Sequence, residues 1–144
     1  MKYIKLSLVV IWMIVIFLFS NQKAVESTKL SDGFILKTVR LIEEITNKKY
    51  SDEEILNKFV KPVRKFAHFI IYFILGMLVY NYIRIYGYKN TFLISLFICI
   101  GYACTDEIHQ IFVDGRSGEL LDVINDSMGS LIGIFLFKKN TSNK

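Results

Sequence analysis

Long apolar runs, rather than one apolar stripe per helix, dominate the pattern of this 144-residue chain. A helix that crosses a bilayer needs about 20 mostly apolar residues. Stretches of about this length lie near residues 5–20, 64–86, 91–110 and 120–137, and 53% of all residues are hydrophobic. The pattern therefore predicts an all-α integral membrane protein with four transmembrane helices, in a single domain.

The first apolar run follows Lys2 and Lys5, and this arrangement is also how a secretory signal peptide begins. The run ends in Phe-Ser-Asn-Gln-Lys-Ala at residues 19–24, without a small-x-small cleavage signal. We therefore interpret the run as an uncleaved first span.

The segment between the first two spans, residues 27–60, is polar overall but carries helical signals. From residue 27 to residue 45 the apolar side chains recur near a 3.6-residue period, which predicts an amphipathic helix along the membrane surface. Ser51 followed by Glu54 is the pattern of a capping box, in which each residue bonds the other's backbone amide. A second short helix is therefore expected over about 52–60.

Three features of the spans bear on their packing. Pro62 fits the first turn of the second span, where a missing backbone N–H removes no helical bond. Gly129-x-x-x-Gly133 in the fourth span lets another helix backbone approach closely. Cys99 and Cys104 are five residues apart on one helix and point in different directions, so no disulfide between them is expected.

Polar and charged side chains gather at one set of helix ends. With four spans, the end of the first, the start of the second, the end of the third and the start of the fourth lie on one side of the membrane. All 13 acidic residues are also on that side. The candidate functional cluster consists of Arg64, Lys65, His68, Tyr72, Asp106, Glu107, Gln110, Arg116, Asp122 and Asn125. A charged group costs about 2.5–3.5 kcal/mol at the bilayer centre, so such groups are usually paired, hydrated or functional.

The distribution of Lys and Arg indicates the orientation of the chain. Eleven of the 18 lie on the acidic side, but most of these are in the 23–65 segment, which also holds seven acids. The short tails and the 84–90 turn carry basic charges alone. The positive-inside rule therefore favours both termini in the cytoplasm and the cluster facing outward.

One hypothesis for the cluster is purely structural. Arg64 or Arg116 can pair with Asp106 or Asp122, and Asn125 can bond a neighbouring backbone. Buried charges persist when they are paired. On this hypothesis the cluster pins the helix ends together and binds no ligand.

A second hypothesis is the binding of a polar head group. Arg64, Lys65 and Arg116 can hold a phosphate or carboxylate, because arginine offers a bidentate fork. The expected partner is a membrane lipid, a lipid-linked precursor or an amphiphilic antibiotic. Nucleic acid is not expected, since the net charge of +5 comes without a basic reading helix or an RNA-binding aromatic motif.

A third hypothesis is catalysis. His68 together with Asp106, Glu107, Asp122 or Asp126 can supply acid–base groups or divalent-metal ligands. The chain contains no His-Glu-x-x-His, no Gly-x-Ser-x-Gly and no phosphate-binding loop. The sequence therefore predicts no metal and no cofactor, and it leaves open whether the protein is an enzyme.

Several motifs, taken together and in order, resemble the VanZ-like family. They are Phe-Ser-Asn-Gln after the first run, R-K-x-x-H-F-x-x-Y-x-x-L-G from Arg64 to Gly76, D-E-x-x-Q-x-F from Asp106 to Phe112, and Gly115-Arg116 followed by Asp122, Asn125, Gly129 and Gly133. The resemblance implies a small polytopic protein of the bacterial cytoplasmic membrane. The family's namesake is associated with low-level resistance to the lipoglycopeptide teicoplanin.

The resulting prediction is a VanZ-like envelope protein that lowers susceptibility to lipoglycopeptides such as teicoplanin through an outward-facing polar pocket. The alternatives are a membrane enzyme that modifies an envelope lipid or cell-wall precursor, and a structural ion-pair network without a ligand.

Overall fold

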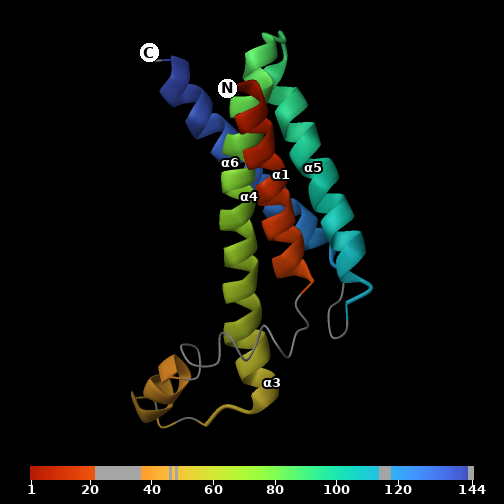
Figure 1. The fold of residues 1–144 in the computed structure, drawn as a ribbon. Coiled ribbons are helices and arrows are strands. Elements are labelled where there is room, and N and C mark those ends of the chain that lie inside the picture. Colours follow the sequence, from red (N-terminus) through yellow and green to blue (C-terminus); the bar gives the residue numbers. More distant parts are fainter. Residues whose placement is uncertain (22–36, 46, 48, 114–117, 143–144) are drawn as a thin grey trace.

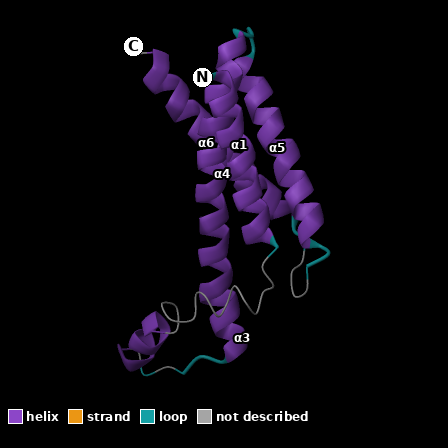
Figure 2. Cartoon of the chain, viewed as in Figure 1, coloured by secondary structure: helices purple, strands orange, loops and turns teal. Residues whose placement is uncertain are grey.

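The computed structural model describes residues 1–21, 37–45, 47, 49–113 and 118–142. Within these residues the regular structure is entirely helical (Figures 1 and 2). The helices are α1 (Lys2–Ser20), α3 (Asp52–Ile55), α4 (Lys61–Ile83), α5 (Thr91–Gln110) and α6 (Leu120–Ser142), with a π-helical stretch η1 (Leu56–Val60) before α4 and a 3₁₀ turn η2 (Arg84–Tyr86) after it. The predicted all-α class is confirmed.

Four of the helical segments are long and apolar enough to cross a membrane. They are Lys2–Ser20, Asn57–Tyr86, Thr91–Gln110 and Leu120–Thr141. The last one continues past the predicted end at residue 137, because lysine is a good helix former whose long stem can lie along an apolar surface. The four predicted spans are thus present as four long helices.

The two termini lie at the same end of the bundle (Figure 1). The ends of α1 and α5 and the starts of α4 and α6 lie at the opposite end. This is the arrangement expected from counting four spans, and it brings polar residues from distant parts of the sequence together.

The tightest packing in the bundle is between α4 and α6, which have the most extensive mutual contacts. A Cβ atom on Gly129 would collide with the backbone carbonyl of Phe69, and one on Gly133 would collide with that of Phe73. The two helix backbones therefore touch, as in other small-xxx-small contacts between membrane helices. The predicted role of the Gly129-x-x-x-Gly133 motif is confirmed.

Hydrogen bonds fix α1 in the groove between α4 and α5. The indole Nε1 of Trp12 donates to the carbonyl oxygen of Ile71 at 2.8 Å. The hydroxyl of Tyr102 donates to the carbonyl oxygen of Met13 at 2.6 Å. Buried apolar side chains of the three helices fill the space between them: Val9, Ile16, Tyr72, Leu75, Val79, Ile83, Cys99 and Ala103. Cys99 is buried and Cys104 is exposed, and both are free thiols, as predicted.

The segment before α4 begins at the expected capping box. The Ser51 backbone N–H donates to the Glu54 carboxylate at 3.1 Å, and the Glu54 N–H donates to the Ser51 hydroxyl at 3.3 Å. The bond from the Ser51 backbone lowers the pKa of Glu54, with Lys58 acting in the same direction. The predicted helix start is therefore confirmed.

The helix continues to Val60, as predicted, but its second half is π-helical: α3 ends at Ile55 and η1 follows it. Pro62 lies in the first turn of α4, as expected. Since Pro62 has no N–H to donate back to the preceding turn, the wider π-helical turn is accommodated just before it.

Part of the predicted amphipathic helix over 27–45 lies outside the described residues. Residues 37–45 are helical. Val39 is buried there against Val60, with Tyr50 and Phe59 packed around them. This small apolar cluster attaches the segment to the beginning of the second span.

Candidate functional site

A narrow pocket opens at the end of the bundle where α4, α5 and α6 meet. We call it the polar pocket, and it is lined by Arg64, Lys65, His68, Gln110, Asp122, Asn125 and Asp126. Its empty volume is about 220 Å³ including the open mouth. The enclosed part has room for roughly one water molecule or a small ion.

Lys65 is the main ionic link between α4 and the start of α6. Its Nζ forms ion pairs with the carboxylates of Asp122 and Glu119, the latter at 2.9 Å. The Glu119 N–H in turn donates to Glu107 Oε1 at 2.6 Å, which ties α5 to the same point. The positive charge of Lys65 is thus neutralised within the protein.

Arg64 differs from its sequence neighbour Lys65 in its ionic contacts. It lines the polar pocket but forms no ion pair with any residue that the structure describes. Successive residues on an α-helix point about 100° apart, so the two side chains leave α4 in different directions. The structural hypothesis placed Arg64 in a pair with Asp106 or Asp122, whereas Lys65 takes Asp122.

Asn125 anchors α6 to α4. Its amide Nδ2 donates to the backbone carbonyl of Lys65 at 3.0 Å and lies 3.3 Å from Asp126 Oδ1. One turn further along, the Ser130 hydroxyl donates to the carbonyl of Tyr72 at 3.1 Å. These bonds hold the Asp126 backbone at a fixed distance from α4, as expected for a residue that bonds a neighbouring backbone.

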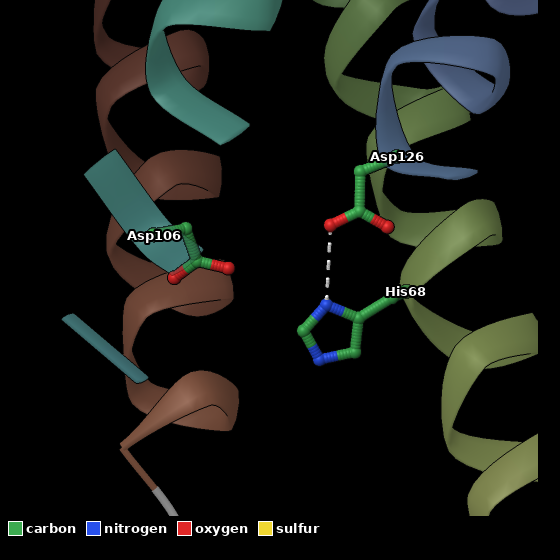
Figure 3. A group of neighbouring side chains, drawn as sticks. All are labelled: His68, Asp106 and Asp126. Carbon is green, nitrogen blue, oxygen red and sulfur yellow. Dashed lines mark ion pairs between the residues drawn. The ribbon is translucent and has the colours of Figure 1, made fainter. Parts of the chain in front are cut away.

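On the inner side of the pocket lie His68 of α4, Asp106 of α5 and Asp126 of α6, which we call the His–Asp group (Figure 3). His68 Nδ1 is 3.5 Å from Asp126 Oδ2, and one atom of each of the three side chains lies within 4.8 Å of the others. Both carboxylates are almost completely buried, with exposed fractions of 4% for Asp106 and 2% for Asp126. Figure 3 shows the Asp106 carboxylate facing the other two across a gap.

The two oxygens of Asp106 have different surroundings. Oδ2 accepts hydrogen bonds from the Ser20 hydroxyl at 2.8 Å and from the Gln110 amide at 3.4 Å. Oδ1 is buried and has no hydrogen-bond partner among the described residues. The same is true of the hydroxyl of Tyr72, which lies one turn after His68 on α4.

The structure brings together most of the predicted cluster. Its members on the pocket wall are Arg64, Lys65, His68, Gln110, Asp122 and Asn125. Tyr72 and Asp106 lie deeper in the bundle, and Glu107 lies to one side, where it accepts the bond from Glu119. Arg116 lies outside the described residues.

Two residues of the site were not in the predicted cluster. Asp126 lines the pocket; the catalytic hypothesis had named it as a possible partner of His68, and it lies one turn after Asp122 and so on the same helix face. Ser20 donates to Asp106; the Phe-Ser-Asn-Gln motif includes Ser20, but the motif alone does not indicate which residue the serine contacts. His109 lies away from the pocket, stacked on Phe17.

The arrangement combines a guanidinium at the pocket wall, without an ion pair among the described residues, with an imidazole and two buried carboxylates behind it. Such a set can bind an anionic oxygen, exchange protons with a bound group or hold a cation. The geometry alone favours an interaction with a small polar group rather than a large one, because the enclosed space is small.

Comparison with known proteins gives one match. A family model described as VanZ/LLP1 matches residues 5–140, which is nearly the whole chain. No curated protein and no solved structure matches. The match agrees with the four long apolar helices in indicating a multi-pass membrane protein. This chain belongs to the VanZ/LLP1 family.

Proposed function

We propose that this protein lowers the susceptibility of bacteria to lipoglycopeptide antibiotics such as teicoplanin, and that its polar pocket binds the anionic group of an amphiphile. Family membership supports a role in antibiotic resistance. The observation that carries the pocket proposal is Arg64, a cation on the pocket wall without an ion pair among the described residues. Arginine is the residue best suited to bind a carboxylate or phosphate through two parallel hydrogen bonds.

The surroundings of the pocket fit an amphiphile better than a water-soluble anion. Val63 and Phe66 on α4 are 51% and 65% exposed, and Leu120 and Leu121 on α6 are 77% and 69% exposed. These apolar side chains neighbour pocket residues in the sequence and lie at the same end of the bundle. An acyl chain can lie against them while the head group contacts Arg64, since apolar surface favours apolar contact.

The proposed orientation places the pocket on the outer face of the bacterial cytoplasmic membrane, with both termini inside. The basic tails and the 84–90 turn support it, because they carry no acidic residue. A lipoglycopeptide or a lipid-linked precursor in the outer leaflet would then reach the pocket without crossing the membrane.

The test is the teicoplanin susceptibility of a sensitive bacterium that expresses the wild type, Arg64→Gln or Arg84→Gln. Arg84→Gln is the matched control, because Arg84 is exposed at the opposite end of the bundle. We expect wild type and Arg84→Gln to protect the cells and Arg64→Gln to protect them at least about tenfold less, as a lost charge-assisted bond implies. Membrane levels are measured by immunoblot. Equal protection by Arg64→Gln at equal levels would reject the pocket as the working site.

A second candidate is a membrane enzyme that modifies an envelope lipid or cell-wall precursor. The proximity of His68 to Asp126, at 3.5 Å, favours it, because an imidazole held by a carboxylate is a common general base. The two candidates differ in how protection depends on the amount of protein. A binding protein acts in proportion to its abundance, whereas a small amount of enzyme changes most of its substrate.

A further inference from the structure

We infer that His68, Asp106 and Asp126 form a binding site for a single divalent transition-metal ion, such as Zn²⁺ or Mn²⁺. Each ligand comes from a different helix, α4, α5 or α6, and no two are close in the sequence. This explains why no metal-binding motif with short spacing is present. The inference does not depend on the proposed role in resistance.

The separations between the three side chains match those of ligands around a single ion. Two ligands bound to one ion at about 2.1 Å lie about 3–4 Å apart. The separation of 3.5 Å between His68 Nδ1 and Asp126 Oδ2 falls in this range. The whole group spans up to 4.8 Å, so small side-chain rotations suffice to close it around an ion.

The charges of the His–Asp group also favour a bound cation. Asp106 and Asp126 are two acids buried within the same group, and one histidine faces them. Lys65 is already paired with Asp122 and Glu119, so it does not neutralise the group. His68 offsets at most one of the two negative charges, and Arg64 forms no ion pair with either carboxylate among the described residues. A divalent cation between the two buried carboxylates supplies the remaining positive charge.

Two unpartnered polar atoms also indicate a bound ion. Among the described residues, Asp106 Oδ1 and the hydroxyl of Tyr72 are buried without a hydrogen-bond partner. Tyr72 is completely buried and lies one turn after His68 on α4. Buried polar atoms are nearly always satisfied, so an ion and its bound water are the expected partners here.

The donor set narrows the choice of metal. One imidazole and two carboxylates suit Zn²⁺ and Mn²⁺, whereas Mg²⁺ and Ca²⁺ favour oxygen ligands alone. Three protein ligands leave at least one position for water or another ligand. Since His68 and Asp126 also line the polar pocket, that open position is reachable from the pocket.

The test is the metal content of the purified protein in detergent after equilibration with Zn²⁺ or Mn²⁺ and removal of free ions. We expect about one ion per chain in the wild type. Asp106→Asn and Asp126→Asn are expected to hold at least about tenfold less. Glu54→Gln is the control, because Glu54 is an acid outside the polar pocket whose partners are Ser51 and Lys58, and it should retain the ion.

A second measurement on the wild type alone covers the case in which a variant does not fold. A chelator should lower the midpoint of thermal unfolding, and one equivalent of the metal should restore it, because an ion that binds only the folded state stabilises it. The inference is overturned if the wild type retains neither metal, if the two variants bind as much as the wild type, or if the chelator leaves the midpoint unchanged.

Discussion

Gly133→Leu is expected to eliminate folded protein from the membrane. A Cβ atom at this position already collides with the backbone carbonyl of Phe73, and a backbone cannot rotate away as a side chain can. The leucine side chain would force α6 away from α4, at the most extensive helix contact of the bundle. Overpacking alone costs about 1–3 kcal/mol. Separating the helices also disrupts the bonds of Asn125 and Ser130 to α4.

The matched control for this change is Gly101→Leu. Gly101 is also a helical glycine within a span, but no atom lies within 4 Å of a Cβ built on it. Membrane levels and size-exclusion profiles in detergent should match the wild type for Gly101→Leu, whereas Gly133→Leu should be degraded or aggregated. A Gly133→Leu protein with a normal profile would show that α4 and α6 do not pack as described.

Lys65→Met is expected to give the second largest loss of stability. It removes the cation that Asp122 and Glu119 share, so both carboxylates lose this ion pair. The loss should be about 1–3 kcal/mol, which is below the value for a fully buried pair because Lys65 and Glu119 are partly exposed. The fluorescence of Trp12, the one tryptophan, reports thermal unfolding because its indole is bonded to α4.

Lys61→Met provides the control, since Lys61 is one turn earlier on α4 and forms no ion pair with a described residue. Adding Asp122→Leu to Lys65→Met should recover part of the stability, because it removes the more buried of the two carboxylates that lose the lysine. If Lys65→Met unfolds at the same temperature as the wild type, the ionic link between α4 and α6 is not a source of stability.

The sequence predicted the architecture because the signals involved are strong and local. Apolar runs of about 20 residues indicate membrane-spanning helices. The number of spans then determines which helix ends lie on the same side of the membrane. Ser51 and Glu54 were found because a capping box depends on residues three apart. Gly129 and Gly133 were found because only small residues allow backbones to touch.

The details of the polar site depend on contacts between helices, and those are not visible in a one-dimensional pattern. Arg64 and Lys65 are both basic and adjacent, so only the rotation of α4 decides which one meets Asp122. Asp126 was left out of the predicted cluster in favour of Asn125, although both face α4. The bond from Ser20 to Asp106 joins residues 86 positions apart, and no local rule predicts it.

The central claim is that the polar pocket binds an anionic amphiphile through Arg64. Its most direct test is equilibrium binding of labelled teicoplanin to the purified protein in detergent, with wild type, Arg64→Gln and Arg84→Gln compared. The account predicts saturable binding of about one molecule per chain to wild type and Arg84→Gln, and affinity at least about tenfold lower for Arg64→Gln. Equal affinity for wild type and Arg64→Gln, or no binding to the folded wild type, would contradict the account.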